Sequence, residues 1–227
     1  MNSTLPVVES FHSLQGEGAH VGRSAFFIRL AGCDVGCSWC DTKHSWNSRN
    51  HPQITLEQLA EETATAAKDG AAFVVLTGGE PLHHNIAPLC EALQRATETN
   101  PGGPLAIHLE TSGVNPLSGK PNWITLSPKR HAPPHPELLA HCHELKVVIN
   151  NQEDIHFAEA MAAAALKARK LPNSPEDISA DDQGDELLLL LQPSWNNPEA
   201  QQVAINFVKA HCQWRLSVQT HKWLGVR

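Results

Sequence analysis

Short apolar runs rich in β-branched and aromatic residues alternate with helical patterns along most of this chain. Such alternation is typical of parallel strands joined by crossover helices. With about six such units in 227 residues, the chain falls short of a closed eight-stranded barrel, which takes about 250 residues. We therefore expect an α/β fold, a partial, open (β/α) barrel of about six parallel strands. The expected strands lie at 24–30, 73–78, 105–111, 123–128, 144–149, 186–193 and 214–220, and the expected helices at 55–70, 86–98, 136–143, 153–169 and 197–212.

Length and composition indicate one domain over 1–227, because 41% hydrophobic residues suffice for a single core. The net charge of −7 and the scattered Lys and Arg argue against a nucleic-acid partner. No apolar run reaches the roughly 18 residues of a membrane span, and the N-terminus does not resemble a signal peptide. We expect a cytoplasmic protein with no membrane partner. The polar, acidic stretch 170–185 is expected to be a mobile surface insertion.

Three cysteines lie close together directly after the first expected strand, in the string GCDVGCSWCD. In a reducing compartment, a tight group such as Cys33, Cys37 and Cys40 indicates a metal site and not a disulfide framework. Three thiolates can hold three irons of a 4Fe-4S cubane, and the fourth iron is left open because no other cysteine lies nearby. An open metal position is a reactive one, so these cysteines are the expected catalytic centre.

A zinc knuckle is the alternative explanation of the same cysteines. It would need a fourth ligand, for which His44 and Cys142 are candidates. The C-x3-C-x2-C spacing differs from the paired C-x2-C of zinc ribbons, and a domain of this size needs no metal to fold. A non-catalytic zinc or iron-sulfur module therefore stays open as a competing hypothesis.

Polar residues follow several expected strands, where ligands gather in α/β folds. In TGGEP, Gly78 and Gly79 permit close approach of a backbone, and Glu80 supplies an acceptor. Lys129 suits a carboxylate as a point charge, although a solvated loop lysine is the common alternative. The other candidates at strand ends are Thr111, Ser112, Ser127, Pro128 and Gln192.

Three features near the cysteines bear on a substrate. The glycines of SLQGEG at 13–18 would let the backbone contact a flat heterocycle, and Glu17 could pair with a guanidine-like edge, although a simple glycine turn is the alternative. Arg29 inside an apolar strand needs a partner, for which a substrate carboxylate is suited unless that strand face is exposed. The hydroxyl of Thr42 could join a Mg2+ site, since that ion prefers oxygen ligands.

The cysteine loop after the first strand resembles the signature of the radical S-adenosylmethionine superfamily. The resemblance implies that S-adenosylmethionine binds the open iron through its amino and carboxylate groups. An electron from the reduced cluster then cleaves it to methionine and a 5′-deoxyadenosyl radical. TGGEP resembles the motif that holds the methionyl amino group, and Trp39 stands where an aromatic residue often lies near the adenine. The implied cofactor contacts are Trp39, Asp41, Gly78, Gly79, Glu80, Thr111, Ser112, Ser127, Pro128, Lys129 and Gln192.

Further motifs, in order over nearly the whole chain, resemble the 7-carboxy-7-deazaguanine synthase family: SLQGEG, R-x3-C-x3-C-x2-C-D-T, TGGEP, ETSG, SPK and QTHK-x-LG. The resemblance implies abstraction of the C6 hydrogen of 6-carboxy-5,6,7,8-tetrahydropterin, ring contraction and loss of ammonia, in a pathway toward queuosine. It also implies Mg2+ at Thr42, a homodimer, and an electron donor such as a flavodoxin or ferredoxin. The implied substrate contacts are Leu14, Gln15, Gly16, Glu17, Arg29, Thr77, His221 and the carboxylate of Arg227.

Three features depart from the pattern of at least part of the family: the short gap between Cys33 and Cys37, which is much longer in some members, the acidic stretch 170–185, and the bulk and charge of Arg227. A glycyl-radical-enzyme activase, which shares the cysteine spacing but acts on a protein, is a rival within the superfamily. SLQGEG and the apolar tail that contains Trp223 argue against it.

Overall fold

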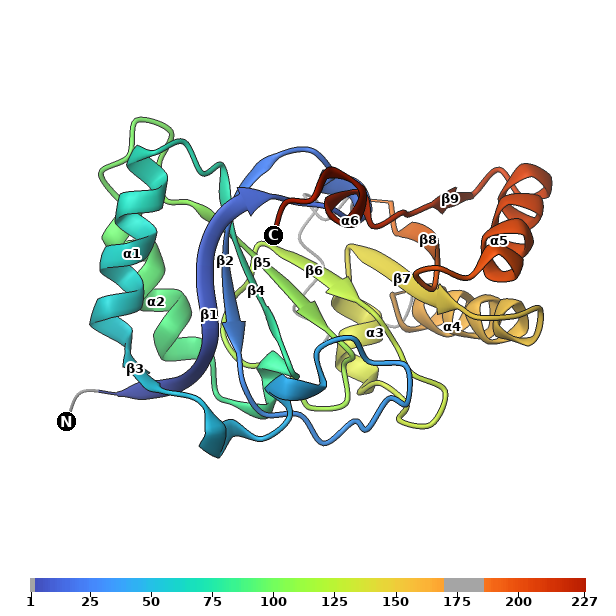
Figure 1. Cartoon of the computed structure of the whole chain (residues 1–227), viewed down its shortest axis with the longest axis horizontal. Coiled ribbons are helices and arrows are strands. Elements are labelled where there is room, and N and C mark those ends of the chain that lie inside the picture. Colours follow the sequence, from blue (N-terminus) through green and yellow to red (C-terminus); the bar gives the residue numbers. More distant parts are fainter. Residues whose placement is uncertain (1–2, 170–185) are drawn as a thin grey trace, which may run out of the picture.

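The computed structural model describes residues 3–169 and 186–227, which form one nine-stranded sheet with helices against it (Figure 1). The strand order is β3-β1-β2-β4-β5-β6-β7-β8-β9. Neighbours from β2 to β9 run parallel, whereas β1 and β3 add antiparallel pairs at one edge. The predicted open, partial barrel of parallel strands is confirmed. The strands are β1 Thr4–Leu14, β2 Ser24–Leu30, β3 Gln53–Thr55, β4 Phe73–Gly78, β5 Ala106–Thr111, β6 Trp123–Leu126, β7 Glu144–Ile149, β8 Leu188–Pro193 and β9 Trp214–Leu216.

The helices follow the predicted segments closely. Thr55 is the N-cap of the first helix, and its Oγ1 accepts a hydrogen bond from the Gln58 amide at 3.1 Å. The strand predicted at 214–220 is shorter than expected, because β9 ends at Leu216, residues 217–219 form a connection, and a short helix begins at Thr220. The helices are α1 Leu56–Lys68, α2 Ala87–Thr97, α3 Pro136–His141, α4 Glu153–Arg169, α5 Pro198–Ala210 and α6 Thr220–Leu224.

The sequence pattern does not predict β1, although it is an 11-residue strand. Its register against β2 shifts between Val7 and Glu9, which marks a β-bulge. Before the bulge, Leu5 and Val7 lie in the core beneath the helices, and after it Phe11 stacks on Phe27 on the other face of the sheet. The bulge therefore breaks the period-two alternation by which strands are predicted.

The two faces of the sheet differ in character because side chains alternate along each strand. On the outer face, Ile28, Leu76 and Leu109 are fully buried against helical residues such as Leu59 and Leu89. This packing forms the main core, and it leaves the inner, concave face to polar and aromatic residues.

Aromatic rings fill the inner face at the amino ends of the strands. His108 of β5 stacks on Phe73 with ring centroids 4.1 Å apart. The loop between β1 and β2 carries a 3-10 turn, Gly18–His20, and the ring of His20 lies 4.5 Å from both His108 and Trp123. Because aromatic rings fill the inner face at the amino ends of the strands, a ligand site on this face must lie at the carboxyl ends.

No helix within 3–169 and 186–227 combines the length and the apolar character needed to cross a bilayer. The acidic insertion predicted at 170–185 lies outside the described residues.

We expect acid to destabilise the fold through His108. Burial, assisted by neighbouring His20 and Arg23, lowers the pKa of His108 from 6.5 to about 3. Between these values the unfolded chain binds more protons than the folded one, so this stabilisation is complete above about pH 6.5 and is lost as the pH falls toward 3. Urea unfolding of His108→Gln should therefore show a weaker loss of stability on acidification than the unchanged protein. The exposed His156 supplies the control His156→Gln, and an acid dependence unaltered by His108→Gln would contradict the prediction.

Candidate active site

The three predicted cluster cysteines lie on the loop that follows β2, at the carboxyl ends of the parallel strands. Backbone hydrogen bonds hold the start of this loop, from the Gly32 amide to the Ser45 carbonyl (2.7 Å) and from the Cys33 amide to the Trp46 carbonyl (3.1 Å). Gly32 has a φ of +108°, a conformation that favours glycine. The chain thereby turns sharply out of the strand just before the first cysteine.

The thiols of Cys33, Cys37 and Cys40 all line a cavity of about 800 Å3. Cys37 is buried and the other two are half-buried. Burial raises the pKa of the Cys33 and Cys37 thiols, so they become thiolates only when a cation compensates the charge. Three such thiols on one cavity wall fit the predicted 4Fe-4S cluster.

The geometry does not favour the zinc alternative. Within the described ranges, no three His, Cys, Asp or Glu side chains converge as they would around a single metal ion. Cys142 is buried elsewhere, with its Sγ 3.6 Å from the Leu139 carbonyl, and neither Cys142 nor His44 lines the cavity. In a cubane each iron takes one thiolate, so the sulfurs surround a larger body and need not converge on a point.

The TGGEP loop after β4 lies directly against the cysteine loop. The Gly79 amide donates to the Leu30 carbonyl (2.9 Å), and the Glu80 amide donates to the Gly32 carbonyl (2.8 Å). A Cβ at Gly78 would collide with the Leu30 backbone, and one at Gly79 would collide with the Gly32 carbonyl. Both glycines are therefore required by the close approach of these two loops.

The buried carboxylate of Glu80 joins the ends of β4 and β5. It accepts hydrogen bonds from the Thr111 hydroxyl (2.5 Å), from the Ser112 amide (2.8 Å) and hydroxyl (2.5 Å), and from the Leu82 amide (3.1 Å). Thr111 and Ser112 thus bind Glu80 as well as lining the larger cavity. Their direct contact with a cofactor stays a prediction.

Lys129 places a cation inside the larger cavity. Its Nζ donates to the Ser127 carbonyl at 2.7 Å and to the Ser127 hydroxyl at 2.9 Å, and no carboxylate among the described residues forms an ion pair with it. Burial lowers the pKa of this ammonium, and the neighbouring Cys37 and Glu80 partly offset the effect. Pro128 is buried and does not line this cavity, whereas its neighbours Ser127 and Lys129 do. A side-chain contact from Pro128 is therefore not supported.

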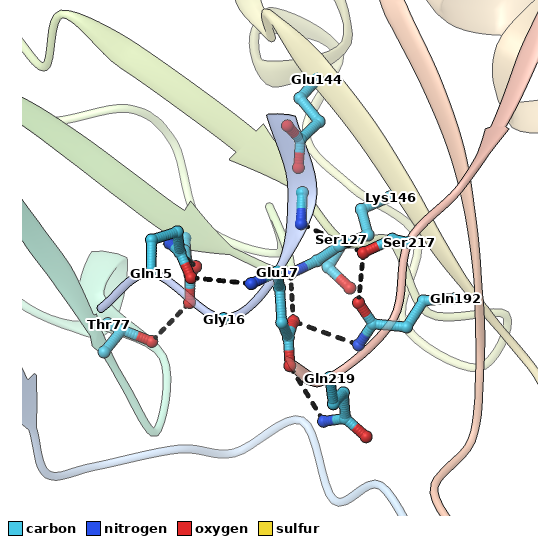
Figure 2. Close-up of polar contacts among 12 residues, drawn as sticks. Gln15, Gly16, Glu17, Thr77, Ser127, Glu144, Lys146, Gln192, Ser217 and Gln219 are labelled. Carbon is cyan, nitrogen blue, oxygen red and sulfur yellow. Dashed lines mark hydrogen bonds and ion pairs between the residues drawn. The ribbon is translucent and has the colours of Figure 1, made fainter. Parts of the chain in front are cut away.

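A buried ion pair holds the loop between β1 and β2 in place (Figure 2). One carboxylate oxygen of Glu17 accepts from Lys146 Nζ (2.5 Å) and from Gln192 Nε2 (3.1 Å), and the other accepts from Gln219 Nε2 (2.9 Å). The side chains of Lys146 and Glu17 are only 6% and 17% exposed. Burial raises the pKa of Glu17, but the Lys146 ammonium and these hydrogen bonds outweigh it and lower the pKa to about 2. Glu17 thus connects the loop to β7, to β8 and to the segment before α6.

A second cavity of about 240 Å3 adjoins the first, with Glu17, Thr42 and Thr77 among the residues that line both. The eight residues predicted to contact substrate all line it: Leu14, Gln15, Gly16, Glu17, Arg29, Thr77, His221 and Arg227. The predicted cofactor residues other than Pro128 all line the larger cavity: Trp39, Asp41, Gly78, Gly79, Glu80, Thr111, Ser112, Ser127, Lys129 and Gln192. The residues predicted to bind the cofactor and those predicted to bind the substrate therefore line two adjoining cavities, with Pro128 as the exception.

The sequence analysis does not select Glu110 as a site residue, although its side chain lines both cavities. Its carboxylate accepts from Gln15 Nε2 (3.1 Å) and from the Thr77 hydroxyl (3.0 Å). The sequence feature that could have identified Glu110 is its position near the carboxyl end of an expected strand, directly before Thr111. Lys222 was missed as well, and its Nζ donates to Asp41 Oδ2 at 2.8 Å. This ion pair joins the cysteine loop to α6.

Thr42 and Arg29 occupy the expected places but have protein partners in this structure. The Thr42 hydroxyl lies 3.5 Å from Cys40 Sγ, next to both cavities. Arg29 Nε donates to Glu9 Oε1 at 3.0 Å, so the partner required by its position is already present in the protein. Binding of Mg2+ at Thr42 and of a carboxylate at Arg29 stay predictions.

Comparison with known proteins gives consistent results. The sequence pattern of the radical SAM superfamily matches residues 27–129. A 7-carboxy-7-deazaguanine synthase from Prochlorococcus marinus is 54% identical over 226 residues, which cover 100% of both chains. One from Synechocystis is 45% identical over 99% of this chain and 94% of its own. The crystal structure of QueE from Escherichia coli is similar with a TM-score of 0.75 and 30% identity, covering 96% of this chain and 95% of that one. The similarity thus extends well beyond the cysteine loop.

We expect Glu17 and Lys146 to depend on each other for stability. Lys146→Met would leave a buried carboxylate without its cation, which costs about 3–5 kcal/mol in comparable pairs. The double variant Glu17→Gln/Lys146→Met removes both charges and should recover most of that loss. Urea unfolding of the two single variants and the double variant measures the coupling. Additive losses in the double variant would contradict the prediction.

Proposed function

Because this chain belongs to the 7-carboxy-7-deazaguanine synthase family of the radical S-adenosylmethionine superfamily, we propose that its two adjoining cavities hold that family's cofactor and substrate. The protein is a radical lyase of queuosine biosynthesis that converts 6-carboxy-5,6,7,8-tetrahydropterin to 7-carboxy-7-deazaguanine with loss of ammonia. One observation supports this assignment of the two sites. The cavity lined by the three cysteines and the cavity lined by the predicted substrate residues have several lining residues in common.

The larger cavity is proposed to hold the cluster and S-adenosylmethionine, which when bound supply the 5′-deoxyadenosyl radical. The thiolates of Cys33, Cys37 and Cys40 would bind three irons. Lys129 offers an ammonium for the methionyl carboxylate, and its lack of a carboxylate partner among the described residues supports this role. Glu80 keeps the adjoining strand ends in register for the cofactor.

The smaller cavity is proposed to hold the pterin. Gln15 and Glu110 present an amide and a carboxylate, which suit the donor and acceptor groups along the edge of a pterin ring. Arg29 is suited to the substrate carboxylate. Thr42 lies where both cavities meet, so its hydroxyl is placed to take part in a Mg2+ site between cofactor and substrate.

The remaining expectations are proposals as well. A flavodoxin or ferredoxin as electron donor and a homodimer rest on the family resemblance alone, whereas a cytoplasmic location rests on the sequence analysis. The single-domain organisation is proposed as well, and it is consistent with one sheet running through the described residues.

The surroundings of the site favour a small molecule over the protein substrate of a glycyl-radical-enzyme activase. Lys222 of α6 joins Asp41 of the cysteine loop beside the larger cavity, and Thr220 donates through its amide (2.9 Å) and hydroxyl (3.0 Å) to the Gly16 carbonyl. The two adjoining cavities, of about 800 Å3 and 240 Å3, together have the size of a small-molecule site, which supports a small ligand over a protein segment.

We expect the purified protein, reconstituted without oxygen, to bind about four iron atoms per chain as a brown cluster. Cys40→Ala should abolish both the cluster and turnover, because one iron loses its thiolate. Cys212→Ala, which removes an exposed cysteine, is the matched control and should retain both. Iron analysis and absorbance spectra measure the outcome. Turnover by Cys40→Ala, or a colourless protein that binds zinc, would contradict the assignment.

The substrate is tested by incubating the reduced protein with S-adenosylmethionine and 6-carboxy-5,6,7,8-tetrahydropterin. We expect 5′-deoxyadenosine together with 7-carboxy-7-deazaguanine, identified by chromatography and mass spectrometry. Cleavage of S-adenosylmethionine without the deazapurine would indicate a radical enzyme of different specificity.

A further inference from the structure

Arg29 faces the smaller cavity with part of its guanidinium unpaired. Its Nε donates to Glu9 Oε1 at 3.0 Å, while its two terminal nitrogens make no hydrogen bond to other described residues, at 3–169 and 186–227. Arg29 lines the cavity and Glu9 does not. The free edge of the guanidinium carries the two parallel donors that bind a carboxylate in bidentate fashion. Glu9 therefore holds Arg29 from behind and leaves this edge free.

The bulge in β1 brings Glu9 to this position. Leu5 and Val7 lie in the core on the outer face, and an unbroken alternation would place Glu9 on that face too. The register shift between Val7 and Glu9 instead places Glu9 directly opposite Arg29 on β2. Bulges commonly redirect a side chain next to a functional site, and this bulge turns the Glu9 side chain toward Arg29.

A second guanidinium balances the charge of Glu9. Arg227 Nη2 donates to Glu9 Oε2 at 2.7 Å, so each carboxylate oxygen of Glu9 receives one arginine. The guanidinium of Arg227 also lies 5.3 Å from the ring centroid of Phe11, which is itself stacked on Phe27. The three side chains of Arg29, Glu9 and Arg227 together carry one net positive charge, which favours a carboxylate at the free edge of Arg29.

We propose that Glu9 is a positioning residue for the substrate carboxylate, because it holds Arg29 in the orientation that presents its free edge to the cavity. This inference rests on the proposed function, which supplies a substrate with a carboxylate. Without Glu9, the flexible arginine side chain would be ordered only when substrate binds, and that ordering would weaken binding. Glu9 does not compete with the substrate, since it occupies the Nε side of the guanidinium.

The test compares Glu9→Leu with Glu9→Gln, whose amide oxygen can still accept from Arg29 Nε. For 6-carboxy-5,6,7,8-tetrahydropterin, Glu9→Leu should raise KM about tenfold, as loss of an orienting charge-assisted hydrogen bond would, with kcat nearly unchanged. Glu9→Gln should stay within about threefold of the unchanged protein. The inhibition constant of tetrahydropterin without the 6-carboxylate should move less than about twofold in either variant, since this ligand does not use Arg29.

Glu62→Gln is the matched control, because Glu62 accepts from the Ser10 hydroxyl on the opposite face of β1. It should leave KM unchanged. An unchanged KM in Glu9→Leu, an equal rise in Glu9→Gln, or an equal weakening of the ligand without a carboxylate would each overturn the role of Glu9. Failure of the unchanged protein to form the deazapurine would instead refute the proposed function, so the two failures are distinguishable.

Discussion

The arrangement of the site depends on the buried ion pair between Glu17 and Lys146. A concave inner face that binds polar ligands carries buried charges, and a buried carboxylate such as that of Glu17 requires a cation and hydrogen-bond donors to compensate it. The Glu17 carboxylate accepts hydrogen bonds from side chains of β7, of β8 and of the segment before α6. These hydrogen bonds also fix the loop that carries Gln15 and Gly16. Two of these residues, Glu17 and Gln219, line both cavities, whereas Lys146 and Gln192 line only the larger one.

The cysteine and TGGEP loops show a second way in which the backbone prepares the site. Two amide-to-carbonyl hydrogen bonds extend the pairing of β2 and β4 past the ends of both strands. This extension requires Gly78 and Gly79, because any side chain there would meet the neighbouring backbone. These hydrogen bonds between the two loops thus determine the position of Cys33.

Local patterns predicted much of this molecule from its sequence. The parallel strands and their helices follow apolar periodicity, and the residues at the strand ends converge because parallel strands share one carboxyl edge. Residues whose role depends on distant partners were harder to find. β1 escaped prediction because a bulge interrupts its alternation, and the partner of Arg29 is Glu9, twenty positions earlier on that same strand. Glu110 was passed over because its contacts to Gln15 and Thr77 come from two other strands or loops.

The contact between Thr220 and Gly16 joins residues 204 positions apart. The residues of the C-terminal segment that line the smaller cavity, Gln219, His221 and Arg227, lie next to this contact. The opposite wall comes from β1 and the loop that follows it, through Leu14, Gln15 and Gly16. Both ends of the described chain therefore enclose the compartment proposed for the pterin, so a change at either end would alter its shape.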